Sequence, residues 1–295
     1  MHIENLRFFY EVAKAKSIST VSKSSHISQS ALSQQLLKLE DNLNSKLFVR
    51  SNKGVTLTPE GDIVFKHCKV IIDTYEKMLL EVESSHLEEI YINIDGLDIL
   101  TYTLIPSAIS KIKKSFPDHI IKIVSSEDSY NNIIHNISDI NISYNNYKNI
   151  NSIISKELYL DKLVFISHST FTPNELTIED FINTPFIMVQ DTLNLQDMLS
   201  SKLESLGYSM DSLNILFSTD SYHSALMGIK NIQAISVMPY GIYNSVYKNL
   251  GYKLINIEDL EFPISMYINF EEQFYKREKA FIKKLISTLK GFLKA

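Results

Sequence analysis

Small hydroxyl and amide side chains are concentrated near the start of the chain. Residues 17–33 hold eight serines, and Gln29 and Gln34 stand among or directly after them. Hydroxyl and amide groups of this size donate and accept hydrogen bonds, and they allow a backbone to approach a phosphate or the edge of a base closely. The chemistry that this stretch offers is therefore recognition by hydrogen bonding.

A leucine ladder predicts the element that positions these groups. Leucines at spacings of four, three and four residues are typical of the apolar stripe of an amphipathic helix, with Ser28 as its N-cap. A shorter helix over residues 19–25 and a turn at 26–27 precede it, so the pattern predicts a helix-turn-helix. The ladder consists of Leu32, Leu36, Leu39 and Leu43, and the opposite face carries Ser30, Ser33, Gln34 and Lys38.

The next stretch, "LFVRSNKGVTLTPEG", predicts a two-stranded wing. Residues 47–50 and 55–57 suit strands, and the turn between them contains Asn52 and Gly54, which tolerate positive φ. Arg50 and Lys53 stand where a wing would lie against a phosphate backbone. Thr58 and Pro59 then start another helix as N-cap and first helical residue.

These motifs give the chain a specific resemblance. "SQSALSQQLLKLEDNL", "KLFVR" and "VTLTPEG" together resemble the winged helix-turn-helix of LysR-type transcriptional regulators, whose length the chain also fits. The chain departs from the family pattern at Val21-Ser22, Ser25 and Ser30. The alternative is a serine-rich loop before an ordinary surface helix. The expected DNA contacts are Thr20, Ser28, Gln29, Ser30, Ser33, Gln34, Lys38, Arg50 and Lys53.

Charge and composition agree with a DNA-binding head on a globular body. Residues 1–58 contain eight basic and four acidic side chains, a net charge of +4, which leaves 21 basic and 30 acidic side chains and a net charge of −9 for the rest. The chain is 44% hydrophobic and 21% charged. It has no apolar run long enough to span a bilayer and no signal-peptide pattern at its start, so we expect a cytoplasmic protein.

A helix of some 27 residues is predicted from residue 59 onward, and it carries an apolar seam. The seam residues step by four and three, which is typical of helices that pair with a partner. Packing on the chain's own domain is the alternative, but the resemblance also implies a linker helix through which two chains pair. Cys68, the only cysteine, is either a seam residue or an inert buried one. The expected dimerisation residues are Val64, Cys68, Ile71, Tyr75, Met78 and Val82.

From residue 90 onward, Ile- and Val-rich runs such as "IYINI", "IIKIV" and "ISMYINF" alternate with helix-length stretches. This predicts an α/β fold with mainly parallel sheets. The region resembles the effector-binding region of the same family, which looks like a two-lobed periplasmic binding protein. The expected domains are a head at 1–58, a linker helix at 59–88 and a regulatory domain at 89–295. Lobe one spans residues 89–160 and 264–295, and lobe two spans 161–263.

Ligands of open α/β sheets bind at the carboxyl ends of the strands, so we expect an effector cleft there. Acids dominate the corresponding loops, with Asp95, Asp98, Glu127 and Asp128 and without Lys or Arg. This charge disfavours a carboxylate and suits a cationic or polyhydroxylated effector. The alternative is that the acids face solvent around a vestigial pocket. The expected effector contacts are Asp98, Thr101, Ser126, Asp128, Gln190 and Asp191.

No enzyme motif is found. The sequence contains neither phosphate-binding glycine pattern nor nucleophile elbow, and its eight histidines show no metal-ligand spacing. We therefore predict no catalytic residue, no metal and no cofactor. The expected function is sequence-specific control of transcription, with duplex DNA, an unknown small effector, RNA polymerase and further copies of the chain, as a dimer or tetramer, as partners. A solute-binding protein, an architectural DNA-binding protein and an effector-independent DNA-binding protein are the alternatives.

Overall fold

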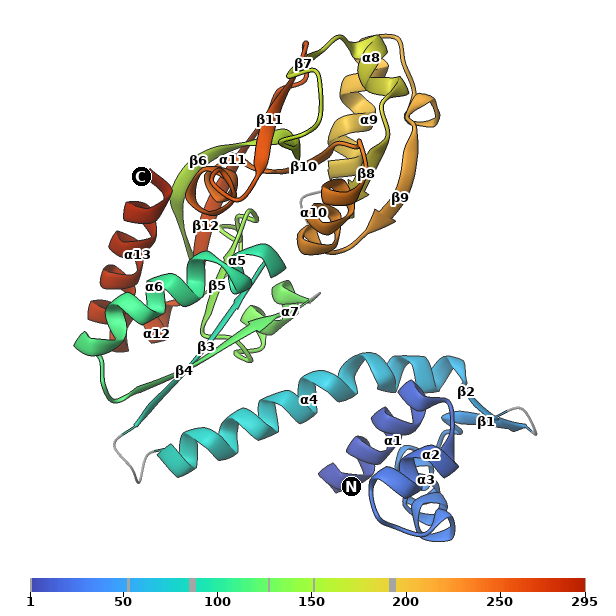
Figure 1. Cartoon of the computed structure of the whole chain (residues 1–295). Helices are drawn as coiled ribbons and strands as arrows, with labels where there is room; N and C mark the ends of the chain where they lie inside the picture. The colour runs from blue at the N-terminus through green and yellow to red at the C-terminus, as the bar shows by residue number, and fades with distance from the viewer. Residues whose placement is uncertain are drawn as a thin grey trace. The chain divides into compact units, whose positions relative to one another are not determined.

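The computed structural model describes residues 2–51, 54–84, 89–126, 128–150, 152–190 and 195–294 (Figure 1). Three predicted site residues, Lys53, Glu127 and Asp191, lie outside these ranges. The chain forms two units, Met1–Glu88 and Glu89–Ala295, here called the head and the body.

The head contains the predicted winged helix-turn-helix. Leu32, Leu36 and Leu39 are buried against Leu6 and Phe9, which confirms most of the leucine ladder, whereas Leu43 is exposed. The elements are α1 (Ile3–Ala15), α2 (Ile18–Ser24), α3 (Gln29–Leu43), the wing strands β1 (Phe48–Ser51) and β2 (Gly54–Leu57), and α4 (Pro59–Ser84).

The serines of the head serve two purposes. Ser17 and Ser28 are N-caps, since their hydroxyls accept hydrogen bonds from the backbone amides of Thr20 at 3.2 Å and Ala31 at 3.1 Å. Ser22, at a departure from the family pattern, is buried, and its hydroxyl donates to the Ser19 carbonyl at 3.0 Å. The departure therefore leaves no unsatisfied hydroxyl in the core.

The body begins with a parallel sheet. Strands β3 (Ile90–Gly96), β4 (His119–Ser125) and β5 (Ile140–Ser143) lie in the order β4-β3-β5, and both pairs are parallel. Figure 1 shows α6 and α13 side by side over this part of the fold. The helical elements here are α5 (Asp98–Tyr102), α6 (Leu104–Ile112), the short η1 (Lys113–Ser115), α7 (Ser129–Ile134), α12 (Glu272–Arg277) and α13 (Lys279–Lys294).

Two long strands connect the lobes. Strand β6 (Ile153–His168) pairs antiparallel with β12 (Phe262–Glu271), and the predicted lobe boundaries at residues 160–161 and 263–264 fall within these two strands. The prediction of mainly parallel sheets is therefore corrected: the longest ladder is antiparallel, because the chain crosses in one direction on β6 and returns on β12.

The second lobe is built on β6 and on a separate parallel pair. β10 (Ser236–Pro239) and β11 (Tyr252–Ile257) both pair antiparallel with β6, and β7 (Glu175–Leu176) extends β11. β8 (Phe186–Val189) pairs parallel with β9 (Ile215–Thr219). The helical elements are α8 (Ile178–Asn183), α9 (Leu195–Ser205), η2 (Met210–Ser212), α10 (Tyr222–Asn231), α11 (Tyr240–Ile242) and η3 (Tyr243–Tyr247).

The buried carboxylate of Asp161 stabilises β6 at the point where the chain crosses between the lobes. Asp161 of β6 accepts hydrogen bonds from the Gly241 amide at 3.0 Å and from the Tyr144 hydroxyl at 3.0 Å. A side chain at Gly241 would meet this carboxylate and Leu293 at 3.0 Å each, so the close approach requires glycine. Burial raises the pKa of Asp161, although these hydrogen bonds oppose the rise. The crossing point is thus fixed by polar groups as well as by packing.

Candidate nucleic-acid interface and ligand pocket

The free face of α3 carries polar side chains at the surface of the head. Gln29, Ser30, Gln34 and Lys38 are exposed, and Ser33 is partly buried. The opposite face is held in the core by the leucines, so the helix is rigid behind its exposed groups. A helix presented in this way can place amide and hydroxyl groups against the base edges of a major groove.

Two further predicted contacts are exposed but already have local partners. The Ser28 hydroxyl caps α3 and lies 3.0 Å from the Ser30 hydroxyl. The Thr20 hydroxyl donates to Ser17 at 3.0 Å. Both side chains are exposed, so their remaining hydrogen-bonding capacity faces solvent.

The wing is anchored to the loop after α1. Gly54 has φ of +125°, and a Cβ there would lie 2.7 Å from the Lys16 carbonyl oxygen, which accepts a hydrogen bond from the Val55 amide at 3.1 Å. Arg50, opposite Val55 in the β1-β2 register, is exposed. The wing therefore presents the Arg50 guanidinium from a fixed backbone.

A carboxylate that the sequence analysis missed joins α3 to the wing. Glu40 is only 4% exposed, and its Oε1 accepts hydrogen bonds from the backbone amides of Leu47 at 2.8 Å and Phe48 at 3.2 Å. Its other oxygen lies 3.4 Å from the Lys46 ammonium. The signal was present in the sequence, because Glu40 follows Leu36 by four residues and so continues the buried face of the helix.

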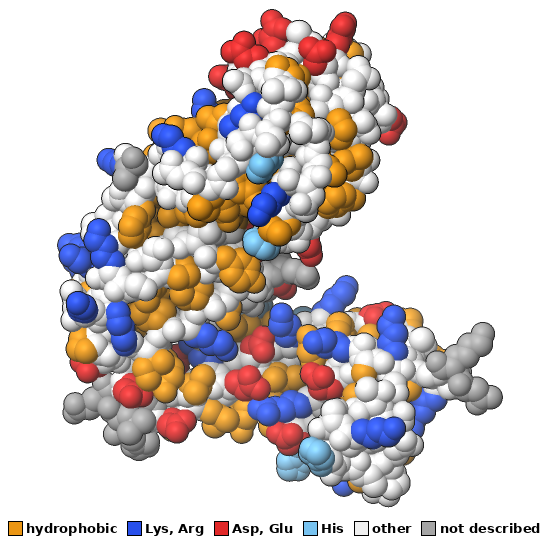
Figure 2. Space-filling model, in the orientation of Figure 1, with side chains coloured by type: hydrophobic (Ala, Val, Ile, Leu, Met, Phe, Trp, Pro, Cys, Tyr) orange, Lys and Arg blue, Asp and Glu red, His pale blue; other side chains and the backbone are white. Residues whose placement is uncertain are grey.

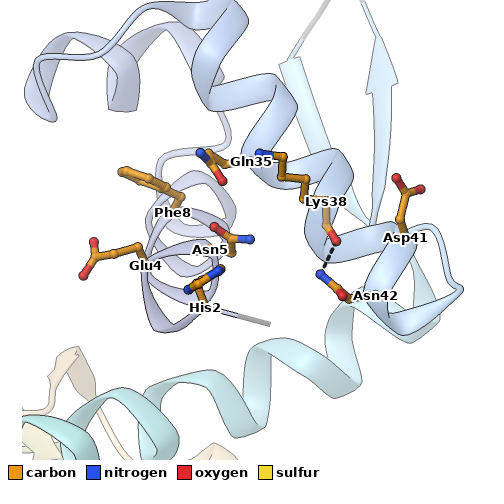
Figure 3. A pocket seen from close by; sticks show the side chains of 8 residues that line it. All are labelled: His2, Glu4, Asn5, Phe8, Gln35, Lys38, Asp41 and Asn42. Atoms are coloured by element: carbon orange, nitrogen blue, oxygen red, sulfur yellow. Dashed lines mark hydrogen bonds between the residues drawn. The ribbon is translucent and has the colours of Figure 1, made fainter.

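A hollow lies between α1 and α3 (Figure 3), with a volume of about 860 Å³. Glu4 and Asp41 oppose His2 and Lys38 in its lining, so its charge is mixed, and the amide of Asn42 donates to the Lys38 carbonyl at 2.7 Å. Lys38, a predicted DNA contact, borders this hollow as well as the polar face of α3. The mixed charge distinguishes the hollow from a phosphate-binding surface.

Of the predicted seam residues of α4, some are buried in the head's own core and others are exposed. Cys68 is fully buried in the head's own core, and burial raises the pKa of its thiol to about 11. Its assignment to a dimer seam is therefore corrected, in favour of an inert buried cysteine. Val64 packs partly against the same core, and Tyr75 is half-buried. The exposed apolar face of α4 consists of Ile63, Ile71, Met78, Leu79 and Val82, and Leu80 is exposed on the opposite side of the helix.

The body contains a pocket of about 480 Å³ at the carboxyl ends of its parallel strands, as the strand-end rule predicts. Residues from both lobes line it. The lining comprises Leu97, Asp98 and Tyr102 after β3, Ser125, Ser126, Ser129 and Tyr130 around the end of β4, Ser143, Asn145 and Tyr147 at and after the end of β5, Gln190 after β8, and Asp220 and Ser221 after β9.

Three of the six predicted effector contacts, Asp98, Ser126 and Gln190, line this pocket. Two others, Thr101 and Asp128, do not line the pocket. Thr101 is buried and donates its hydroxyl to the Asp98 carbonyl at 2.7 Å. Asp128 is exposed and accepts hydrogen bonds from Asn131 at 2.9 Å. Asp191 cannot be placed because it lies outside the described residues.

Asp95 is buried rather than placed at the mouth of the cleft. It lies within β3, and its carboxylate accepts hydrogen bonds from Ser129 at 3.0 Å and Asn132 at 2.9 Å. Burial raises its pKa, and these hydrogen bonds oppose the rise. The predicted strand ended at Ile94, two residues before the observed end of β3. Asp95 was therefore assigned to a loop at the cleft instead of to the strand.

The two acids of the pocket lie close in space. Burial raises the pKa of Asp98; hydrogen bonds with the Ser221 hydroxyl and the backbone amides of Ile99 and Tyr222 oppose the rise, and the negative charge of Asp220 adds to it. The carboxylate of Asp98, from lobe one, therefore accepts hydrogen bonds from the N-cap residue and the first residue of α10, in lobe two.

Acidic side chains also gather at the outer end of the second lobe, over β7 and α8 (Figure 2). The exposed residues there are Glu175, Glu179, Asp180, Glu258 and Asp259. Phosphate is repelled from such a surface. Among the described residues, no group of three or more His, Cys, Asp or Glu side chains is arranged to hold a metal ion. In the same part of the chain, no helix combines the length and hydropathy that a membrane span requires.

Comparison with known families gives two matches that together cover most of the chain. Residues 3–62 match the family described as "Bacterial regulatory helix-turn-helix protein, lysR family". Residues 91–289 match "LysR substrate binding domain". The first match covers the winged helix-turn-helix and the second covers the two-lobed body with its pocket.

Individual proteins show the same similarity over most or all of the chain. The chain is 27% identical to an HTH-type transcriptional regulator of Methanocaldococcus jannaschii, MJ0300, over 80% of this chain and 81% of that protein. The crystal structure of CbnR, a LysR family transcriptional regulator, superposes with a TM-score of 0.71 at 13% identity, covering both chains fully. CbnR complexed with its target DNA gives 0.69 at 13% identity, covering 99% of this chain and 100% of that one.

Proposed function

The chain belongs to the LysR family of DNA-binding transcriptional regulators, which are not enzymes, and on that premise we propose that a small molecule in the body's pocket controls how the head acts at a promoter. The observation that carries the proposal is the pairing, in one chain, of an exposed polar recognition helix with a pocket of about 480 Å³ lined from both lobes. A head alone would serve an architectural protein, and a body alone would serve a solute-binding protein.

Recognition of DNA is assigned to α3 and the wing. Ser30, Ser33 and Gln34 face base edges in the major groove, because they form the free polar face of a helix whose opposite face is buried. Arg50 contacts the phosphate backbone from the wing. Thr20, Ser28, Gln29, Lys38 and Lys53 are the further expected contacts.

Pairing of two chains is assigned to the apolar face of α4. Met78, Leu79 and Val82 are each about half exposed, at 47%, 46% and 55%, and a helix gains stability when such side chains are buried against a partner. A dimer presents two recognition helices to two half-sites, so the operator should have dyad symmetry. A tetramer would join two such dimers.

Coupling is assigned to the strands β6 and β12. Ligand contacts in the pocket come from both lobes, and these two strands carry the chain between the lobes. A ligand that binds one arrangement of the lobes more tightly than another shifts the population toward it, and equal affinity for both would shift nothing. RNA polymerase is the proposed recipient of the change. A DNA-binding protein that responds to no effector is the alternative.

The test uses fragmented genomic DNA of the source organism. The full chain should retain a small set of fragments and protect a site with dyad symmetry from cleavage, and Gln34→Ala should lose that selectivity. Retention of all fragments alike by both proteins would refute specific regulation and favour an architectural role. The coupling is tested on the retained fragment: a ligand that stabilises the body should change the protected length or the affinity.

A further inference from the structure

The charged side chains that the structure describes in the lining of this pocket are both acidic. Asp98 and Asp220 line it, and none of the lining residues in the described part of the chain is Lys, Arg or His. The described stretches that supply the lining, residues 97–102, 125–126, 128–130, 143–147, 190 and 219–222, contain no Lys or Arg either. Among the described lining residues, no cationic side chain therefore opposes the negative charge that a ligand meets in this pocket.

The start of α10, where an anion could bind to backbone amides, already has a carboxylate of the chain as its acceptor. α10 begins at Tyr222, and the amides at the start of a helix attract negative charge. Here Asp98 bonds to the Ser221 hydroxyl and to the Tyr222 amide, so the chain's own carboxylate occupies the start of α10. A carboxylate ligand would have to displace Asp98 or lie beside it and Asp220.

A third carboxylate, that of the buried Asp95, adds to the negative electrostatic potential in the pocket. Ser129 lines the pocket and donates its hydroxyl to the buried Asp95 at 3.0 Å. The same hydroxyl lies 3.1 Å from the Ser126 carbonyl, so its one proton is shared between two acceptors within the chain. Ser129 can therefore offer a ligand a hydrogen-bond acceptor but no free donor.

Aromatic rings complete the lining. The rings of Tyr130 and Tyr147 meet edge to face, with centroids 5.5 Å apart and planes at 74°, and Tyr102 also lines the cavity. Tyr147 is buried, whereas Tyr102 and Tyr130 are exposed. The face of an aromatic ring attracts a cation, and two rings in a corner can contact a methylated ammonium group from two sides.

We propose that the pocket binds a small organic ammonium ion, held between the carboxylates of Asp98 and Asp220 and the rings of Tyr130 and Tyr147. The inference rests on the proposed function only in taking this pocket as the effector site. It names the chemical class of the effector: a cation with apolar substituents, in place of an anion or an uncharged polyol.

The experiment measures binding to the full chain by calorimetry and thermal unfolding. The probes are choline, tetramethylammonium and putrescine, each up to about 10 mM, a concentration that detects even millimolar dissociation constants. The matched control for choline is 3,3-dimethylbutan-1-ol, which has the same shape with carbon in place of nitrogen and no charge. Xylitol and succinate represent the polyol and carboxylate classes. At least one ammonium ion should bind and raise the unfolding temperature, and the control alcohol, xylitol and succinate should not.

Variants locate the binding. Asp220→Asn should weaken the binding of that ammonium ion about fivefold, the size of one partly exposed ion pair. Tyr130→Leu should weaken it by a similar factor, because the ring face is lost, and Tyr130→Phe should retain it. Asp211→Asn, which removes an exposed acid that does not line the pocket, should leave binding unchanged.

The failures of the two proposals are distinguishable. No binding by any of the three ammonium ions, equal binding of choline and its carbon analogue, or tighter binding of xylitol or succinate would overturn the ammonium assignment. Binding of an ammonium ion that Asp220→Asn and Tyr130→Leu leave intact would also overturn it. Specific DNA binding is measured in the same preparations without ligand. None of the ligand-binding results above bears on it, whereas its absence would refute the proposed function itself.

Discussion

Replacing Glu40 by Ala should destabilise the head by about 3 kcal/mol. The Oε1 atom of this buried carboxylate accepts two backbone hydrogen bonds, from Leu47 at 2.8 Å and Phe48 at 3.2 Å. A hydrogen bond to a charged group contributes roughly 1.5 to 3 kcal/mol, and the longer of the two contributes at the low end of this range. Ala leaves both buried amides without this acceptor.

Residues 46–48 also contact the start of α4. The loss of stability in Glu40→Ala should therefore extend from the wing to that helix. The Leu47 carbonyl accepts from the Thr58 amide at 3.0 Å, and the Thr58 hydroxyl donates to the Lys46 carbonyl at 2.7 Å. Gly61 packs so closely that a Cβ would lie 2.1 Å from the Leu47 oxygen. A shift of residues 46–48 therefore displaces the base of the wing and the start of α4 together.

Hydrogen exchange measured by mass spectrometry on the full chain isolates this effect. A loss of about 3 kcal/mol should lower the protection of peptides covering residues 40–57 by about a hundredfold. Glu40→Gln keeps an acceptor at Oε1 and should retain most of the protection. Asp41→Ala, at the exposed neighbouring position, should change stability by no more than about 0.5 kcal/mol. Protection in Glu40→Ala within about threefold of the wild type would refute the assigned role of the carboxylate.

Three further predictions concern the wing, the linker helix and the pocket. Arg50→Ala should weaken binding to all DNA sequences and reduce the slope of log affinity against log salt by about 1; an unchanged slope in a salt titration would exclude a phosphate contact. Met78→Asp should convert the protein to monomers in light scattering, whereas Lys69→Asp, which places the same side chain at an exposed position on the opposite side of α4, should not; a monomeric wild type would contradict the pairing. Because the pKa of Asp98 is raised in the fold above its usual 3.8, its charge opposes folding above that raised pKa, and protonation relieves this as the pH falls through it. Asp98→Asn should therefore unfold at a higher temperature than the wild type near pH 7, with the difference shrinking towards about pH 4; a lower unfolding temperature at both pH values would contradict this.

The sequence predicted the elements of the head because each has a local signal. The leucine ladder, the capping hydroxyls of Ser28 and Thr58, and the Pro59 start all act over a few residues, and the structure shows each of them. The seam of α4 was only partly correct. Burial within a chain and burial between two chains produce the same apolar spacing, so the pattern could not show that Cys68 faces the head's own core.

In the body, the strand-end rule located the pocket but not all of its lining. Asp95 was misplaced because the apolar run ends at Ile94, whereas β3 continues to Gly96 through a polar and a small residue that the apolar pattern does not include. Asp220 and Ser221 were missed because β9, which precedes them, had not been predicted as a strand; its residues 215–218 are exposed, which gives no alternation of apolar and polar residues. The tyrosines come from helices and loops that converge only in the folded chain.

The central claim, that this chain reads DNA sequence through α3, is tested most directly by selection from a pool of random duplexes with the wild type and Gln34→Ala. The wild type should enrich a motif with dyad symmetry. Gln34→Ala should lose discrimination of about 1 to 3 kcal/mol at one position in each half-site, while its affinity for random duplex stays unchanged. Enrichment of no motif by the wild type, or of the same motif with the same discrimination by the variant, would contradict the account.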